Sequence, residues 1–138
     1  MSAHRHRSEA TGATAAEGVA RQLRAALETS DLEALGELLD PRVTWGPPGA
    51  TAGICTNRDE VLAWYARGRQ RGGRAEVSET ETVGDKLLVG LVVHGTDAAR
   101  ERGGAAVRWQ VLTLRNGRIA DIVGFDSKEE ALAHATTG

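Results

Sequence analysis

Apolar residues in the first part of the chain recur every third or fourth position, which is the spacing of one helix face. Residues 15–28 form the first such stretch, whose apolar stripe consists of Val19, Leu23, Ala26 and Leu27. A second, shorter helix is predicted to start at a capping box formed by Ser30 and Glu33. It should end at Asp40-Pro41, because proline disfavours helical backbone in the residue before it.

A short strand and a third helix are predicted next. Residues 43–45 read as a strand, and residues 46–56 are too rich in proline and glycine for regular structure. Asn57 then provides a helix cap, with Glu60 as its partner three residues later. This helix should end before Gly72-Gly73.

From residue 74 the apolar period changes from helical to alternating, as in β-strands. Residues 74–83 and 86–95 predict two strands around a turn at Gly84-Asp85. The second is apolar on both faces, which predicts an interior strand or one at an interface. Residues 96–104 are polar and form a hairpin loop.

Asn116-Gly117 separates two further alternating runs, residues 105–115 and 118–125, and is a strong hairpin signal. A last capping box, Ser127 with Glu130, starts a helix that should run to about His134. The predicted order is α-α-β-α-β-β-β-β-α. Helices that precede a meander of antiparallel strands are typical of an α+β fold with helices covering one sheet face.

A two-residue turn pairs Arg115 with Arg118 and so divides the last hairpin into two faces. The more uniformly apolar face is predicted to line the core and pocket, and it carries Val107, Trp109, Val111, Thr113, Ala120, Ile122 and Gly124. The mixed face is predicted to be a dimer or solvent face, and it carries Arg108, Gln110, Leu112, Leu114, Ile119, Asp121, Val123 and Phe125. A β-bulge would invert part of this assignment.

Composition narrows the function classes. The chain has 138 residues, of which 41% are hydrophobic and 26% charged, and this predicts a single globular domain at 15–138 after a disordered tail at 1–14. A net charge of -2 and a pI of about 6.1 argue against nucleic acid as a partner. No apolar run approaches the roughly 20 residues of a membrane span. A single cysteine fits a reducing cytoplasm, where we expect the protein to act.

Four blocks of sequence carry a family resemblance: residues 39–45, 55–62, 108–119 and 128–132. On these blocks the chain resembles an actinobacterial member of the SnoaL-like branch of the nuclear transport factor 2-like superfamily. The resemblance implies a conical barrel, in which a curved, mostly antiparallel sheet wraps around the N-terminal helices and leaves an apolar pocket at its open end. It also implies a homodimer through the outer sheet face. The superfamily includes polyketide cyclases, ketosteroid isomerases, epoxide hydrolases, dehydratases and non-catalytic binding domains, so the fold does not fix the activity.

Polyketide cyclases of this branch use an aspartate as acid/base in the strand after the final turn, and that position matches Gly124 here. The remaining catalytic candidates are His94, Asp121 and Asp126. His94 is either a general base or a simple strand-end histidine. Asp121 is either catalytic or a carboxylate on the solvent or dimer face, and Asp126 is either catalytic or a cap of the last helix.

Ligand-binding candidates are the residues expected to wall the pocket: Trp45, Cys55, Tyr65, Trp109, Val111 and Ile122. Trp64 is interpreted as helix packing. Cys55 precedes a helix N-terminus, which would lower a thiol pKa, although a small buried hydrophobe is the alternative interpretation. His4 and His6 lack supporting ligands, so we expect no metal and no cofactor.

Two hypotheses follow from these observations. One is a non-catalytic module that binds a small hydrophobic molecule in an apolar pocket. The other is a cofactor-free isomerase, cyclase or hydrolase that uses pocket acid/base residues on a polyketide-like or other small hydrophobic substrate. The position of His94, Asp121 and Asp126 relative to the pocket distinguishes the two.

Overall fold

The computed structural model describes residues 11–47, 55–96, 100–101 and 103–137. Its elements follow the predicted order: α2 (Thr11–Thr29), α3 (Leu32–Leu38), β1 (Leu39–Gly46), α4 (Arg58–Gln70), β2 (Arg74–Val83), β3 (Lys86–His94), β4 (Ala105–Arg115), β5 (Arg118–Phe125) and α6 (Lys128–Thr137). The α+β prediction is confirmed, and the last four strands fall almost where the alternating pattern placed them.

The differences lie at the element ends. Helix α2 starts at Thr11, inside the segment expected to be a tail, and β1 is longer than the predicted 43–45. Strand β1 includes Pro41, which is tolerated because β1 lies at the sheet edge. The tail residues 1–10, with His4 and His6, and most of the irregular segment 46–56 lie outside the described residues.

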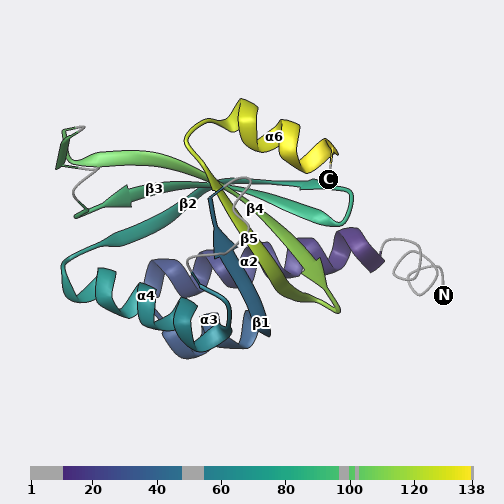
Figure 1. Ribbon diagram of the computed structural model, residues 1–138, viewed down its shortest axis with the longest axis horizontal. Coiled ribbons are helices and arrows are strands. Elements are labelled where there is room, and N and C mark those ends of the chain that lie inside the picture. Colours follow the sequence, from purple (N-terminus) through teal and green to yellow (C-terminus); the bar gives the residue numbers. More distant parts are fainter. Residues whose placement is uncertain (1–10, 48–54, 97–99, 102, 138) are drawn as a thin grey trace.

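The five strands form one mixed sheet in the order β1-β5-β4-β3-β2, in which β1 runs parallel to β5 and all other neighbours are antiparallel. Helices α2, α3 and α4 lie on one side of this sheet, and α6 lies alone on the other (Figure 1). We call the first side the inner face and the second the outer face. The sheet is therefore covered by helices on both sides.

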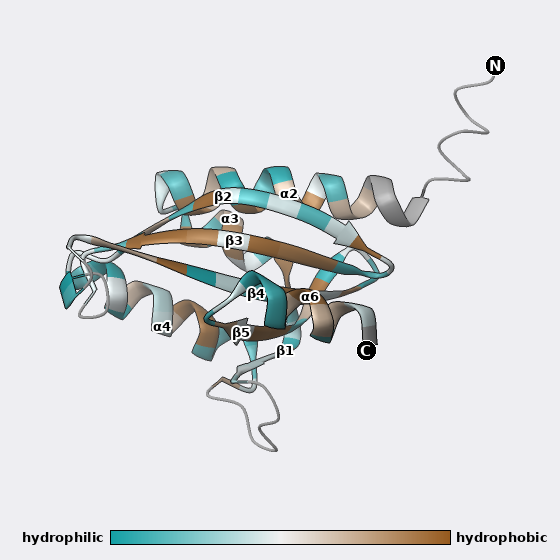
Figure 2. Ribbon diagram, turned by 90° about the horizontal axis from the view of Figure 1, so that it is seen from above, coloured by the Kyte–Doolittle hydropathy of each residue, from teal (hydrophilic) through white to brown (hydrophobic). Residues whose placement is uncertain are grey.

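The inner face holds the larger core. Its fully buried members come from helices and strands together: Leu35, Leu39, Val43, Val61, Leu87, Val89, Leu112 and Ile119. Much of β3 is coloured as hydrophobic in Figure 2, in keeping with its position between two neighbouring strands. Both faces of this strand are apolar because Leu87 and Val89 pack in the inner core and Leu88 packs under α6.

The outer face holds a second, smaller core beneath α6, formed by Leu88, Val111, Phe125, Ala131 and Ala135. Helix α6 starts with the predicted capping box. The Glu130 amide donates to Ser127 Oγ at 3.2 Å, and the Ser127 hydroxyl lies 3.1 Å from Glu130 Oε1. Packing of α6 therefore gives the outer face an apolar character of its own.

The last hairpin contains a β-bulge that the sequence pattern did not reveal. Arg115 pairs with Arg118 and Leu114 with Ile119, but Thr113 pairs with Asp121, so Ala120 is an extra residue in β5. Beyond the bulge Gln110 lies opposite Gly124. The predicted pocket face is consequently wrong for β4, where Trp109 and Val111 lie on the outer face and Leu112 and Leu114 pack in the inner core. On β5, Ile119 and Ile122 both belong to the inner core.

The helix caps were predicted in part. Asn57 caps α4 as expected, accepting from the Glu60 amide at 2.9 Å. The predicted cap Ser30 is wrong: its φ is +54°, and Asp31 instead caps α3 by accepting from the Ala34 amide at 3.0 Å. Ser30 belongs to the turn that ends α2, which leaves Asp31 as the residue with the extended backbone of a cap.

None of the described helices is long and apolar enough to span a lipid bilayer.

Candidate ligand pocket beside Trp64

Two adjoining hollows lie on the inner face where β1, β3 and β5 end and β4 begins. The deeper one has a volume of about 180 Å³ and is lined by Trp45, Trp64, Leu91, Val93, Arg108, Trp109, Gln110 and Gly124. The shallower one, of about 270 Å³, is lined by Trp45, Gly46, Pro47, Trp64, Arg108 and Gly124. We refer to both together as the ligand pocket, because they share four residues.

Two tryptophans form one wall of the ligand pocket, and Tyr65 packs against one of them. Trp45 stacks on Tyr65 with ring centroids 5.4 Å apart, and Trp64 meets Trp45 edge-on at 6.0 Å. Trp64 is 45% exposed, unusual for so large an apolar side chain. A well-packed aromatic wall ending in one exposed indole offers a ligand a flat apolar surface.

Gln110 supplies a neutral polar group to the ligand pocket, and Tyr65 contacts it from the core. The Tyr65 hydroxyl forms a hydrogen bond with the Gln110 side chain, and burial raises the pKa of Tyr65 to about 12. Gln110 is itself buried. Tyr65 therefore stays protonated at neutral pH, where it serves as a hydrogen-bonding group and not as a base.

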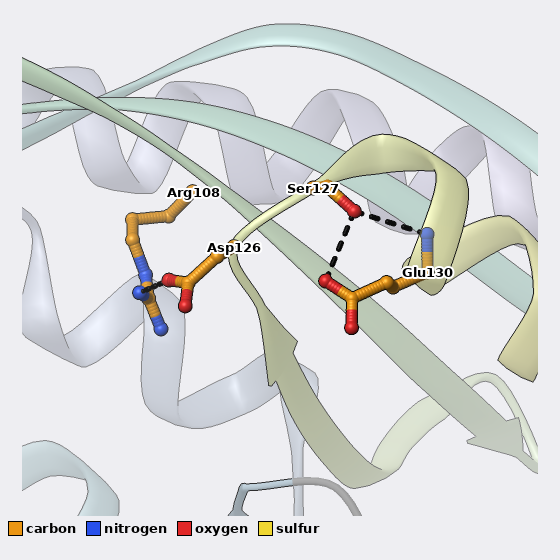
Figure 3. A network of polar contacts seen from close by, with 4 residues as sticks. All are labelled: Arg108, Asp126, Ser127 and Glu130. Carbon is orange, nitrogen blue, oxygen red and sulfur yellow. Dashed lines mark hydrogen bonds and ion pairs between the residues drawn. The ribbon is translucent and has the colours of Figure 1, made fainter.

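Arg108 is the one charged side chain that lines the ligand pocket among the described residues. Its guanidinium forms an ion pair with Asp126, and the two side chains point toward one another in Figure 3. The Asp126 carboxylate is largely exposed. The cap of α6 is the neighbouring Ser127, so Asp126 does not have the capping role that was the alternative interpretation of this residue.

Gly124, which the resemblance equates with the cyclase aspartate, has room beside it. A Cβ placed on it would meet only the Arg108 Nη2 atom, at 3.6 Å, which is ordinary contact. No carboxylate lines the ligand pocket within the described part of the chain, and Asp126 is linked to it through Arg108.

The other two catalytic candidates lie on the outer face. His94 directly follows the inward-facing Val93 in β3, so its side chain lies on the outer face. Its Nε2 atom lies 4.0 Å from the Glu76 carboxylate. Asp121 pairs with Thr113 and accepts from the Thr44 hydroxyl at 2.5 Å. The structure therefore does not bring His94, Asp121 and Asp126 together.

The ligand-binding candidates are distributed over both faces. Trp45 and Trp109 border the ligand pocket, Tyr65 stacks on Trp45, and Ile122 packs in the inner core. The Trp109 ring itself extends over Gly90 on the outer face, 5.6 Å from the Lys128 ammonium, while Val111 is buried under α6.

Cys55 is buried and pairs through its backbone with Trp45, with both N–O distances at 3.0 Å. Burial raises the pKa of the Cys55 thiol, and the charge of Glu60 adds to the increase. The thiol is therefore neutral at physiological pH and serves as a small apolar group near the pocket wall.

Sequence reasoning missed Arg108 and Gln110 as pocket residues because both faces of β4 carry core residues, and the bulge at Ala120 puts Gly124 on the same face as Gln110. Trp64 was missed because a tryptophan on an amphipathic helix is usually packed. Among the described residues, no group of three or more histidine, cysteine or acidic side chains could hold a metal ion.

Comparisons with known proteins agree with this fold. A model of the SnoaL-like domain family matches residues 19–122. No curated protein matches the chain at a significant level.

Three solved structures illustrate the similarity. A protein proposed to be a polyketide cyclase, from Sinorhizobium meliloti, has 26% identity and a TM-score of 0.63, with 78% of this chain and 94% of that chain covered. Bal32a, from a soil-derived mobile gene cassette, has 21% identity and a TM-score of 0.69, with 89% and 97% covered. An epoxide hydrolase of M. tuberculosis has 13% identity and a TM-score of 0.63, with 91% and 92% covered.

Proposed function

The chain belongs to the SnoaL-like domain family, and from this premise we propose that it binds a small hydrophobic molecule in the ligand pocket without a catalytic acid of the cyclase type. One observation carries the proposal. Gly124, which the family resemblance equates with the cyclase aspartate, lines the ligand pocket, and the space beside it is bordered only by Arg108. The remaining wall is largely aromatic or aliphatic, with Gln110 as a neutral hydrogen-bonding group.

The proposal predicts that a neutral aromatic ketone binds beside Trp45 and Trp64. Methyl naphthyl ketone is a suitable probe, because its rings match the aromatic wall and its carbonyl can accept a hydrogen bond. We expect the ketone to change the tryptophan fluorescence in a saturable way. Gly124→Phe should fill the pocket and weaken ketone binding at least about tenfold, a loss of about 1.4 kcal/mol in binding free energy.

Val107→Phe provides the matched control, because Val107 is 45% exposed on the outer face and does not line the ligand pocket. Unchanged affinity in Gly124→Phe would show that the ketone binds elsewhere. Absence of saturable binding to the unmodified protein would exclude this class of ligand.

The alternative function is that of a cofactor-free isomerase, cyclase or hydrolase. It is favoured by the Arg108–Asp126 pair, which links a carboxylate to a pocket-lining cation. In such an enzyme the Asp126 carboxylate would take or return a proton at the pocket rim, and Arg108 would stabilise negative charge on the substrate oxygen.

Product analysis with an aryl epoxide and an aryl β-diketone tests this alternative. Turnover that is lost in Asp126→Asn, but kept in His94→Gln and Asp121→Asn, would establish the enzymatic function. Both control residues lie on the outer face. No turnover of either substrate class by the unmodified protein would leave the binding function.

We also propose a homodimer formed through the outer face, a cytoplasmic location and an actinobacterial origin. The exposed Val107 supports the dimer, the single cysteine supports a reducing compartment, and the low lysine content supports a GC-rich genome. We further propose that residues 15–138 form a single domain. A monomer in light scattering at micromolar concentration would exclude the dimer.

A further inference from the structure

A third hollow adjoins the ligand pocket at Trp64. Its volume is about 270 Å³, and its lining residues are Trp64, Arg67, Gly68, Arg71, Gly95, Thr96 and Arg100. We call it the arginine pocket. Trp64 is the residue that it shares with the ligand pocket, so a ligand that lies against this indole borders both.

One face of α4 forms the first wall. Trp64, Arg67, Gly68 and Arg71 follow the spacing i, i+3, i+4 and i+7, so their side chains project from the same side of the helix. The guanidinium carbon of Arg67 lies 5.8 Å from the centre of the Trp64 ring. The wall therefore presents an aromatic surface and two cations next to each other.

The end of β3 forms the second wall, and glycine allows its close approach. Gly95 has φ of +75°, and a Cβ on it would lie 2.1 Å from the Gly72 carbonyl oxygen. Gly72 in turn ends α4 with φ of +89°, in a motif in which the Gly73 amide donates to the Gly68 carbonyl at 2.8 Å. Two glycine turns thus hold the β3 end against the C-terminus of α4.

The charges around this pocket all have one sign among the described lining residues. Arg67 and Arg71 approach from α4, and Arg100 from beyond β3, where its guanidinium lies 3.4 Å from the Gly95 carbonyl. Neither Arg67 nor Arg71 takes part in the ion pairs of the described chain. Like charges four residues apart on a helix repel, and an anion between them would relieve the repulsion.

We propose that the arginine pocket binds the carboxylate of the ligand whose apolar body lies against Trp64, so that the ligand is an aromatic or alicyclic carboxylic acid. This inference rests on the proposed function of the ligand pocket. Arg67 and Arg71 donate hydrogen bonds to the carboxylate, and the Trp64 indole packs against the ring system. The arginine pocket then determines specificity for acids over neutral ketones of equal size.

Naphthoate and methyl naphthyl ketone are a matched pair of probes for this inference. Titration calorimetry or tryptophan fluorescence should show naphthoate binding about tenfold more tightly than the ketone, equivalent to about 1.4 kcal/mol. In the double variant Arg67→Gln with Arg71→Gln, the preference should fall to about twofold or less, while the affinity for the ketone stays unchanged.

Two further variants complete the test. Arg115→Gln with Arg118→Gln removes the same net charge at the exposed β4–β5 turn and should keep the preference for naphthoate. Gly68→Leu should block the arginine pocket selectively, because a Cβ on Gly68 meets no atom within 4 Å and the leucine can extend into the hollow.

The outcomes separate the two proposals. Equal binding of both probes to the unmodified protein would overturn the carboxylate inference and leave the ligand pocket intact. A preference that persists in the Arg67/Arg71 double variant would also overturn it. Saturable binding of neither probe would contradict both proposals.

Discussion

Gln110 lies directly opposite Gly124 in the β4–β5 ladder, and both residues line the ligand pocket. A hairpin with a two-residue turn and no bulge would instead place Trp109 opposite Gly124. The one-residue shift puts a buried amide beside the position that the family resemblance equates with the cyclase aspartate. The polar character of the ligand pocket therefore depends on the Ala120 bulge as well as on the residue types.

Gly124 should tolerate an acid. In Gly124→Asp the new side chain enters space that only Arg108 borders, so we expect a folded protein with a melting temperature within a few degrees of the unmodified one. The adjacent guanidinium should hold the pKa of the new carboxyl below its usual value, which leaves it ionised at neutral pH. A charged group in the pocket should weaken binding of methyl naphthyl ketone about tenfold or more.

The control for this prediction is Gly124→Ala, which adds the Cβ without the charge and should bind the ketone almost as well as the unmodified protein. Calorimetry gives both stability and affinity. If Gly124→Ala already unfolds the protein, the space assigned to this position does not exist.

Deletion of Ala120 should be tolerated, because Ala120 is the extra residue of the bulge. Without it Ile119 is followed directly by Asp121, and the pairs Leu114–Ile119 and Thr113–Asp121 become neighbours in one uninterrupted ladder in which each residue keeps its face. We expect a loss of about 1–2 kcal/mol in the free energy of unfolding, since a buried alanine and the local pairing with β1 change while Ile122 stays in the inner core.

Urea unfolding measures this loss, with deletion of Val123 as the comparison. Val123 lies in the regular part of the ladder, so its removal moves the register by one and turns Phe125 away from the outer core, at a cost of at least about 3 kcal/mol. Similar stability of the two deletion variants would mean that Ala120 is not an extra residue in the pairing.

The bulge also shows where sequence reasoning reached its limit. The strand bounds were predictable because Gly84 and Asn116-Gly117 mark the turns, and their positive φ values are the conformations that glycine and asparagine favour. It was not predictable which side of β4 packs in the inner core, because both sides are apolar. Leu112 and Leu114 pack against the inner helices, and Val111 packs under α6. An alternating pattern identifies the core face only when the other face is polar.

The candidate site was predicted only in part for the same reason. Trp45 and Tyr65 were expected in the pocket from their residue type, whereas Arg108 and Gln110 depend on the register. Trp64 was interpreted as a packed helix residue. It is exposed because the end of β1 and the start of β4 do not cover its indole. Such an arrangement is tertiary and has no local sequence signal.

Ser127 and Asp126 should differ sharply in their contribution to stability. Ser127→Ala removes the side chain that accepts from the Glu130 amide, so it should cost about 1 kcal/mol. Asp126→Ala breaks an exposed ion pair with Arg108 and should change the stability by less than about 1 kcal/mol. Thermal unfolding of both variants provides the measurement, and equal losses would indicate that Asp126 also supports the start of α6.

Tyr65 should titrate well above its ordinary range. The chain contains one tyrosine, so the ultraviolet absorbance of tyrosinate reports Tyr65 alone, and we expect a pKa of about 12 in the folded protein against 10.0 for the free group. Because the unfolded chain loses this proton first, stability from Tyr65 is complete below pH 10 and is lost as the pH rises from 10 to 12.

Tyr65→Phe tests the same contact at neutral pH. The variant leaves the buried Gln110 amide without its hydroxyl partner and should cost about 1–2 kcal/mol, while its stability no longer responds to the Tyr65 proton above pH 10. Paired urea unfolding at neutral and alkaline pH, with the unmodified protein as reference, measures both effects. A tyrosinate titration near pH 10 in the folded protein would show that the hydroxyl is open to solvent and that it does not pair with Gln110 inside the pocket wall.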